Sequence, residues 1–200
     1  MKEQKLSFLQ NIDNSWTLFL DRDGVINKRI ENGYVLNLNM FEFIDGVLES
    51  LSLLSEIFRR IIVVTNQRAI GKGLMTEEDL KQIHNYMLRE ITSSGGRIDA
   101  IFYCPHDYEK EICSCRKPSI GMALKAKRMF PDIEFKKSIV VGDSQTDMEF
   151  AKNIGAVSVY VGNENLSDHS ILKFKNLKDF SNFLLENLNS FEKGEKGKKK

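Results

Sequence analysis

The sequence is poor in cysteine, proline and tryptophan, and it contains no long apolar run. Of its 200 residues, three are cysteine, three are proline and one is tryptophan. No segment approaches the roughly 20 consecutive apolar residues of a membrane helix, and residues 1–13 lack the apolar core of a signal peptide. Lysine and arginine (29) nearly balance aspartate and glutamate (28), so a predominantly basic, nucleic-acid-binding chain is not indicated. The 42% hydrophobic content is enough for one domain with its own core.

The three cysteines are odd in number and clustered, which argues against a disulfide framework. With one histidine they form Cys-x-His followed by Cys-x-Cys, and the four candidate ligands are Cys104, His106, Cys113 and Cys115. A tight pair of soft ligands at each end suits a closed tetrahedral Zn²⁺ site. The alternative is three free cysteines beside an unrelated histidine. We expect a structural zinc and, because reduced cysteines are typical of a reducing compartment, a cytoplasmic protein.

Composition divides the chain into three parts. We expect an extension over residues 1–14, one domain over residues 15–189 and a basic, disordered tail over residues 190–200. The last eight residues contain five lysines and one glutamate. Such a tail can hold nucleic acid or an acidic membrane, but a solvated terminus is the simpler interpretation. The expected partner is therefore a small molecule, with no nucleic acid and no membrane, and the expected state is a monomer.

Apolar, β-rich runs alternate with amphipathic stretches along the domain. The predicted strands are Thr17–Leu20, Arg60–Thr65, Ile98–Tyr103, Ser138–Val141 and Val157–Val161. The predicted helices are Gly46–Phe58, Thr76–Ser93, Ile120–Phe130, Asp147–Ile154 and Leu177–Leu188. This order predicts a three-layer α/β Rossmann-like domain with a parallel sheet and no large cap domain. The remaining segment, 28–44, reads as a loop or flap beside the strand ends.

The helix over Thr76–Ser93 has the clearest pattern. Its apolar face repeats with helical spacing through Leu80, Ile83, Met87 and Ile91, and Thr76 is a candidate N-cap. His84 falls on the same face, where a histidine in the core or at its rim is the expected interpretation.

Two acids, Asp21 and Asp23, follow the first predicted strand and precede Gly24. Ligands of open α/β sheets bind just beyond the carboxyl ends of the strands. There Asp21 could attack phosphorus directly, since a carboxylate nucleophile suits phosphoryl transfer. Asp23 could protonate the leaving oxygen and then activate water. The alternative is an ordinary strand-ending turn with solvated acids.

A second strand delivers further acids, Asp143 at its end and Asp147 four residues later. A carboxylate that meets Asp21 there would complete an oxygen-rich Mg²⁺ site. Asp147 is then a supporting acid, or it is only the N-cap of the following helix. We expect Mg²⁺ as the catalytic cofactor.

Polar and basic residues complete the predicted phosphate site. The Thr65 hydroxyl, with Asn66 behind it, lies at the end of the Arg60–Thr65 strand and could bond a phosphate oxygen. Lys117 would place a fixed positive charge on the phosphoryl group, and Arg116 offers a planar fork for a second phosphate or sugar hydroxyls. Lys117 lies two residues after Cys115, so zinc would hold the loop that positions the Arg116 and Lys117 side chains.

These four segments resemble the four motifs of the haloacid dehalogenase-like phosphatases. The resemblance implies Asp21 as nucleophile, Asp23 as acid and base, and Thr65 and Lys117 as phosphate-stabilising residues. It also implies Mg²⁺ held by Asp21, by Asp143 and by the main-chain carbonyl of Asp23.

Within that family the chain resembles the heptose bisphosphate phosphatases and the related histidinol-phosphate phosphatases. The segments that carry this resemblance are Asp-Arg-Asp-Gly-Val-Ile-Asn (21–27), Gly-Tyr-Val (33–35), Thr-Asn-Gln (65–67) and Cys-Arg-Lys-Pro (115–118). The resemblance implies removal of the 7-phosphate of D-glycero-D-manno-heptose 1,7-bisphosphate in nucleotide-activated heptose biosynthesis. The implied substrate contacts are Glu31, Asn32, Gly33, Tyr34, Asn66, Gln67, Arg68, Arg116 and Ser144.

Several alternatives stay open. The substrate could be histidinol phosphate or a phosphorylated nucleic-acid end, and a catalytically idle, zinc-stabilised binding module is the alternative outside enzymes. The chain also departs from the family, which usually has a small residue and then glycine where Arg68 and Ala69 stand, and arginine where Lys72 stands. Arg68 is thus either an added phosphate ligand or a sign of a different substrate.

Overall fold

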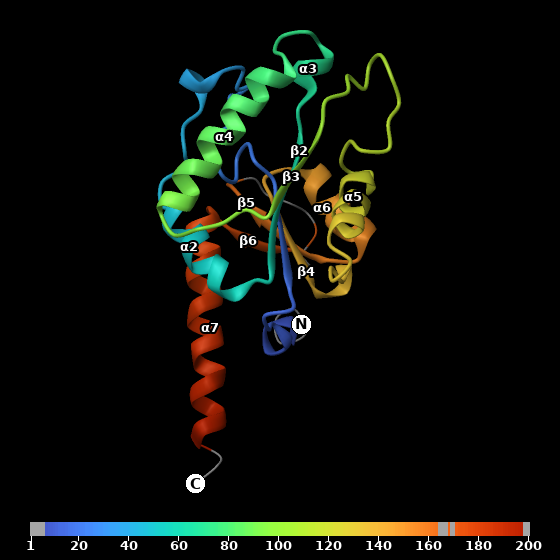
Figure 1. Ribbon diagram of the computed structural model, residues 1–200. Helices are drawn as coiled ribbons and strands as arrows, with labels where there is room; N and C mark the ends of the chain where they lie inside the picture. The colour runs from blue at the N-terminus through green and yellow to red at the C-terminus, as the bar shows by residue number, and fades with distance from the viewer. Residues whose placement is uncertain (1–6, 164–167, 169–170, 198–200) are drawn as a thin grey trace.

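A six-stranded parallel sheet forms the centre of the computed structural model, which describes residues 7–163, 168 and 171–197 (Figure 1). The strand order is β3-β2-β1-β4-β5-β6. The strands are β1 Thr17–Leu20, β2 Arg60–Asn66, β3 Ala100–Cys104, β4 Ser138–Gly142, β5 Val157–Val161 and β6 Leu172–Phe174. All five predicted strands are present, and the Rossmann-like, three-layer architecture is confirmed. The sequence analysis missed β6, because a three-residue edge strand is too short to show a period.

Helices cover both faces of the sheet. The α-helices are α2 Val47–Ile57, α3 Arg68–Gly71, α4 Glu77–Ser93, α5 Gly121–Met129, α6 Gln145–Ile154 and α7 Leu177–Gly197. The 3₁₀ helices are η1 Ser7–Asn11, η2 Leu38–Met40 and η3 Phe135–Lys137. Within the described residues, no helix has the length and apolar character needed to cross a membrane.

Alternation along the strands separates two hydrophobic cores. Leu18 and Leu20 of β1 pack in the larger core with residues of α2, α4 and α7, whereas Phe19 packs in the smaller core with residues of α5 and α6. Figure 1 shows the same division, with α2, α4 and α7 on one side of the sheet and α5 and α6 on the other. Because β1 and β4 are covered on both sides, every residue of these two strands is buried.

The predicted start of α4 is confirmed. The Thr76 hydroxyl accepts a bond of 3.1 Å from the Asp79 backbone N–H, and the Asp79 carboxylate accepts one of 2.8 Å from the Thr76 N–H. This reciprocal capping box satisfies two amide groups that no helical carbonyl can reach. His84 is 7% exposed and lies on the buried face, as expected.

Other helix boundaries differ from the prediction. Helix α6 begins at Gln145 with Ser144 as its N-cap, so Asp147 is not the N-cap but the third residue of the helix. Helix α7 continues to Gly197, into the segment 190–200 that was predicted as a disordered tail, and residues 198–200 lie outside those described. That segment lacks proline and contains lysine and glutamate, both good helix formers, although Gly194 and Gly197 are weak ones.

The segment 28–44 is a flap that folds back on the end of β1. It leaves and returns through Asn27, which forms a bridge with Phe43, and the Ile44 N–H donates to the Ile26 carbonyl at 3.0 Å. The Phe41 and Phe43 rings pack on Tyr86 of α4, with centroids 5.9 and 6.1 Å away. The flap is therefore fixed to the domain by an aromatic cluster.

The strand order fixes where a ligand binds. The chain proceeds from β1 outward to β2 and β3, and then returns to build β4, β5 and β6 on the other side of β1. The connections after β1 and β4 consequently leave a crevice between them, which is the usual ligand position in open α/β sheets. Figure 1 shows α3 and the long loop after β3 at one end of the domain.

Candidate active site

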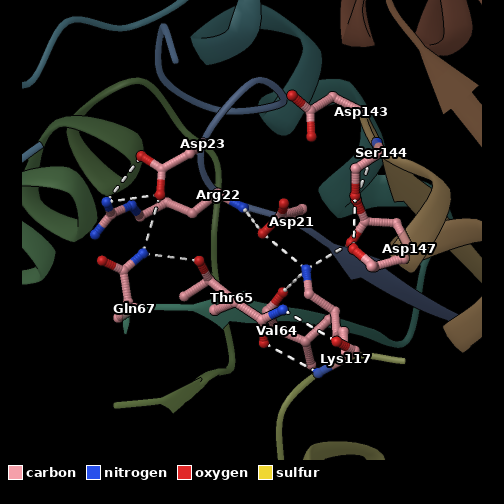
Figure 2. Close-up of polar contacts among 12 residues, drawn as sticks. Asp21, Arg22, Asp23, Val64, Thr65, Gln67, Lys117, Asp143, Ser144 and Asp147 are labelled. Carbon is pink, nitrogen blue, oxygen red and sulfur yellow. Dashed lines mark hydrogen bonds and ion pairs between the residues drawn. The ribbon is translucent and has the colours of Figure 1, made fainter. Parts of the chain in front are cut away.

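Three carboxylates meet where β1 and β4 end (Figure 2). Asp21 directly follows β1, Asp143 directly follows β4, and Asp147 lies on the first turn of α6. Oxygen atoms of all three side chains lie within 4.8 Å of one another. The parallel pairing of β1 with β4 brings two of these acids together, because both strands end at the same edge of the sheet.

Burial and mutual repulsion make this cluster unfavourable for anionic charge. Burial is the largest reason that the pKa of Asp21 rises to about 7; Lys117 opposes the rise, and Asp147 and Asp143 add to it. Burial, followed by repulsion from Asp147, raises the pKa of Asp143 to about 6. A divalent cation with a preference for oxygen ligands would relieve this repulsion. The residues present therefore fit Mg²⁺, and the predicted contribution of the Asp23 main-chain carbonyl stays a prediction.

Gly24 allows the chain to pass directly beside this cluster. Its φ is +88°, in the left-handed region that side chains disfavour. A Cβ atom built on Gly24 would also lie 2.0 Å from the Asp143 Oδ2 atom. Both the turn after β1 and the approach of Asp143 therefore require glycine.

Lys117 is buried in the middle of the site and contacts three separate segments. Its ammonium lies 2.9 Å from Asp21 Oδ1 and 2.6 Å from Asp147 Oδ1, and it donates to the Val64 carbonyl at 2.7 Å. These two carboxylates raise the pKa of Lys117 despite its burial, which would lower it. The Asn66 side chain holds the Lys117 backbone, accepting from its N–H at 3.0 Å and donating to its carbonyl at 3.3 Å. Lys117 is thus a fixed, charged group beside the candidate nucleophile.

Asp23 points away from the three-acid cluster, into a set of donors (Figure 2). The Arg22 guanidinium donates to both of its oxygens at 2.8 and 2.9 Å, Asn27 donates at 2.9 Å and Gln67 at 3.0 Å. Burial alone would raise the pKa of Asp23, but the charge of Arg22 and these three donors hold it below its usual value. The carboxylate is therefore anionic and tightly oriented in the absence of substrate.

Arg22 is a component that the sequence analysis missed. It is fully buried beneath Asp23, and its Nη1 atom lies 3.4 Å from the His84 Nε2 atom. Burial and then the charge of Arg22 lower the pKa of His84 to about 3, so the imidazole is neutral and adds no charge. An arginine between two aspartates is expected at the surface, and only the tertiary position of α4 shows that it is enclosed.

Thr65 lies at the end of β2, as predicted, with its hydroxyl accepting from the Gln67 Nε2 atom at 2.9 Å. The same Gln67 nitrogen donates to Asp23, so one amide connects the candidate phosphate ligand to the candidate acid. The hydroxyl proton of Thr65 is left to donate to a ligand oxygen.

A cavity of about 730 Å³ opens over these groups. Asp21, Asp23, Thr65, Lys117 and Asp143 all line it. All but one of the predicted substrate contacts line it as well: Asn32, Gly33, Tyr34, Asn66, Gln67, Arg68, Arg116 and Ser144. Glu31 is not among the lining residues, although the flap residues next to it are. The catalytic and binding roles of these residues stay predictions.

The cavity also has lining residues that the sequence analysis did not select as contacts: Arg29, Ile30, Val35, Lys72, Tyr108, Gln145 and Thr146. Arg29 of the flap lies 3.2 Å from Asp143 Oδ2. Its position in the sequence could have predicted this contact. Arg29 follows the first strand by only a few residues, and the flap that contains it folds back on the end of that strand. Tyr108 lies inside the cysteine-rich loop, where only its tertiary position brings it to the cavity.

The four predicted zinc ligands come together after β3. The Cys104 sulfur lies 3.5 Å from His106 Nδ1, 3.5 Å from the Cys113 sulfur and 3.2 Å from the Cys115 sulfur, and His106 Nδ1 lies 3.1 Å from Cys115. Three thiols and one imidazole so close together form the donor set of a tetrahedral zinc site. The cluster is therefore compatible with zinc.

Comparisons with known proteins identify relatives over most of the chain. The sequence model of the HAD-hydrolase-like family matches residues 114–188. A D-glycero-alpha-D-manno-heptose-1,7-bisphosphate 7-phosphatase of Campylobacter jejuni is 40% identical over 170 residues, covering 84% of this chain and 95% of that protein. A D-glycero-beta-D-manno-heptose-1,7-bisphosphate 7-phosphatase of Vibrio cholerae is 40% identical over 144 residues, covering 69% and 76%. The crystal structure of D,D-heptose 1,7-bisphosphate phosphatase from B. bronchiseptica, complexed with magnesium and phosphate, aligns with a TM-score of 0.77 and 29% identity, covering 86% of this chain and 98% of that one.

Proposed function

Since this chain belongs to the haloacid dehalogenase-like phosphatases, we propose that it removes the 7-phosphate of D-glycero-D-manno-heptose 1,7-bisphosphate. The observation that carries the proposal is the placement of Asp21. Its carboxylate ends the central strand, lies 2.9 Å from the buried Lys117 ammonium, and faces a cavity lined by the other candidate catalytic groups. A site without catalytic use would gain nothing from burying three acids whose charges repel one another.

In the proposed reaction, a carboxylate oxygen of Asp21 attacks the 7-phosphorus while the bond from phosphorus to the sugar oxygen breaks. Asp23 donates a proton to that departing oxygen, and an aspartyl-phosphate remains on Asp21. Asp23 then takes a proton from water, the water oxygen attacks phosphorus, and the phosphorus–Asp21 bond breaks. Inorganic phosphate leaves with the proton that Asp23 took from water, and Asp21 and Asp23 are again free carboxylates.

The Asp23 environment suits the second half of this cycle directly. Arg22, Asn27 and Gln67 hold Asp23 as an oriented anion, ready to accept a proton from water. For the first half Asp23 must gain a proton, and the negative charge of an incoming phosphate favours that uptake by raising its pKa. Lys117 and the Thr65 hydroxyl hold the phosphoryl oxygens throughout.

The metals have separate places in the proposal. Asp21 and Asp143 would hold Mg²⁺, with Asp147 in support through Lys117 and Ser144, and the ion would supply positive charge beside the phosphoryl group. The cysteine cluster would hold zinc with a structural role alone. Cys115 precedes Lys117 by two residues, so a fixed loop there fixes the direction of the lysine.

The cavity suits a sugar with a phosphate at each end. Lys72 and Arg116 offer positive charge in its lining for a second anionic group, whereas Arg29 is paired with Asp143. Of the two anomers we propose the alpha form, because the relative from C. jejuni named for it aligns with 84% of this chain, against 69% for the relative from V. cholerae named for the beta form. The place in metabolism is the synthesis of nucleotide-activated heptose in the cytoplasm.

The test is phosphate release with Mg²⁺ from each anomer of D-glycero-D-manno-heptose 1,7-bisphosphate, beside histidinol phosphate and a 5′-phosphorylated oligonucleotide. We expect the alpha anomer to give the highest kcat/KM and Asp21→Asn to abolish release. A higher kcat/KM for histidinol phosphate would refute the substrate while leaving the phosphatase chemistry intact. Release by Asp21→Asn at more than about a hundredth of the wild-type rate would refute the nucleophile.

A further inference from the structure

Arg68 lines the cavity, yet its guanidinium is already occupied. Its Nε atom donates to Asp107 Oδ1 at 2.5 Å, its Nη2 atom lies 2.6 Å from Glu109 Oε2, and its Nη1 atom donates to the Tyr108 hydroxyl at 2.9 Å. Only 8% of Arg68 is exposed, and Asp107 is 3% exposed. A guanidinium paired with two carboxylates has little charge left to attract a phosphate. These contacts therefore favour a structural use of Arg68 over the phosphate contact considered from the sequence.

The partners of Arg68 all lie on the cysteine-rich loop. Backbone bonds already join that loop to the segment around Arg68, from the Gln67 N–H to the Cys104 carbonyl and from the Gly71 N–H to the Pro105 carbonyl, each 2.8 Å long. A Cβ atom on Gly71 would lie 2.4 Å from the Asp107 backbone nitrogen, so α3 and the loop are in direct backbone contact. Arg68 extends this contact outward to residues 107–109 and makes one rigid unit of α3 and the loop.

The Tyr108 ring connects this rigid unit to Arg116. The guanidinium carbon of Arg68 lies 3.9 Å from the centre of the Tyr108 ring, and that of Arg116 lies 4.5 Å from it. Within the described part of the chain, the buried Nη1 atom of Arg116 has no hydrogen-bond partner. Arg116 is thus held by a ring face, and it also lines the cavity.

We propose that Arg68 and Tyr108 are positioning residues for Arg116. Arg68 anchors residues 107–109 of the loop to α3, and the Tyr108 ring holds the Arg116 guanidinium where it contacts the non-reacting end of the substrate. This inference rests on the proposed function for the identity of that end, a second phosphate. It also gives a role to Arg68, a residue at which this chain departs from its family.

The geometry explains why a platform is needed. The Arg116 backbone is fixed by its neighbours Cys115 and Lys117, but its long side chain has several rotatable bonds and would otherwise move freely at the cavity. A flat ring under the guanidinium restricts those bonds without using any donor, which a salt bridge would do. Tyr108 is 51% exposed, so its replacement leaves no cavity in the core and tests positioning rather than folding.

A double-mutant cycle tests the proposal, with D-glycero-D-manno-heptose 1,7-bisphosphate and with p-nitrophenyl phosphate, which lacks a second phosphate. We expect Tyr108→Ala and Arg68→Met each to raise KM for the bisphosphate about tenfold, with kcat within about twofold of wild type. Tyr108→Phe keeps the ring and should stay within about threefold in KM. In an Arg116→Met background, Tyr108→Ala should change KM less than about twofold, because the guanidinium it positions is gone.

Arg89→Met is the matched control, since Arg89 also lies over a tyrosine ring, that of Tyr86, at 5.3 Å but outside the cavity. It should leave both substrates unaffected. A tenfold KM effect of Tyr108→Ala that persists in the Arg116→Met background would overturn the proposal, and so would an equal effect on p-nitrophenyl phosphate. Zinc content of every variant should match wild type, and so should the melting temperature of the variants at Tyr108, Arg116 and Arg89. Arg68→Met leaves the buried Asp107 carboxylate without its partner and should melt at a lower temperature.

A crystal structure of Tyr108→Ala separates this inference from the proposed function. We expect the Arg116 guanidinium to leave the position that it occupies in wild-type crystals. If it keeps that position, the inference fails whatever the substrate is. If wild-type enzyme does not hydrolyse the heptose bisphosphate but the guanidinium does move, the substrate assignment fails and the positioning stands.

Discussion

Replacing the candidate nucleophile should stabilise the magnesium-free protein while it abolishes activity. Asp21 is buried beside Asp143 and Asp147, and it is ionised at the cost of desolvation and repulsion. An asparagine in its place would have nearly the same shape without the charge. We therefore expect Asp21→Asn to melt at a higher temperature than wild type in magnesium-free buffer at pH 8, although it releases no phosphate.

The size of this stabilisation follows from the pKa of Asp21, which is about 7 in the folded protein and 3.8 in the unfolded chain. That difference corresponds to about 4 kcal/mol of destabilisation once the carboxylate is fully ionised. The Lys117 ammonium and the Arg22 N–H both contact Asp21 Oδ1, and asparagine keeps this oxygen. Because a neutral oxygen attracts the ammonium less strongly than a carboxylate does, about half of the 4 kcal/mol should be recovered. A gain of about 2 kcal/mol raises the melting temperature of a 200-residue domain by roughly 4–8 °C.

The pH dependence has a definite sign. A carboxyl whose pKa is raised by folding contributes stability that is fully present below 3.8 and lost as the pH rises through about 7. Wild type therefore loses this contribution as the pH rises. The Asp21→Asn variant has no ionisable group at this position, so its stability does not change for this reason. The difference in melting temperature should be largest at pH 8 and should shrink towards zero near pH 4. Differential scanning calorimetry at four pH values, with and without Mg²⁺, measures it.

Two controls make the test specific. Asp45→Asn removes an exposed carboxylate that is not part of the cluster and should change the melting temperature by about 1 °C or less. Added Mg²⁺ should stabilise wild type more than Asp21→Asn, because one of the proposed ligands is missing from the variant. If Asp21→Asn is less stable than wild type at pH 8, or if its advantage does not change with pH, the charge-repulsion argument is wrong.

Three further predictions address the rest of the site. Gly24→Ala should lower kcat/KM at least 100-fold and weaken Mg²⁺ binding measured by calorimetry, because its Cβ would lie 2.0 Å from Asp143; activity within tenfold of wild type would contradict this. Asp23→Asn should lose far more activity on the sugar phosphate than on p-nitrophenyl phosphate, whose leaving group needs no proton, and equal losses would remove the acid role. Cys113→Ser should lower zinc content and the melting temperature and reduce kcat about tenfold, and unchanged stability with normal metal content would refute the zinc loop.

Local sequence patterns were sufficient for the elements that bring the site together. Apolar runs located five strands, and helical spacing located five helices, because burial on one or both faces imposes a period on the chain. The acids at residues 21 and 143 were placed at strand ends for the same reason. The Thr76 cap was also predictable, since its partner Asp79 is only three residues away.

Contacts between segments distant in sequence were not predictable in this way. Nothing local shows that Arg22 is enclosed beneath Asp23 by His84 of α4, or that Tyr108 lies under two guanidiniums. The start of α6 was misplaced because Asp147 and Ser144 are both good capping residues, and the choice between them depends on how the chain leaves β4. Arg68 is the most instructive case, since its charge suggests a phosphate ligand and only the fold shows its contacts with Asp107, Tyr108 and Glu109.

The position of Lys117 explains why a structural metal would be useful in this enzyme. The lysine must reach Val64, Asp21 and Asp147 at once, on three different elements, from a loop that has no regular secondary structure. Ordering such a loop costs about 1–2 kcal/mol of backbone entropy per residue, and a short polar loop buries too little apolar surface to offset that. Zinc bound to the cysteine cluster would supply the missing free energy two residues before the lysine. The catalytic charge is therefore expected to depend on a metal that never touches the substrate.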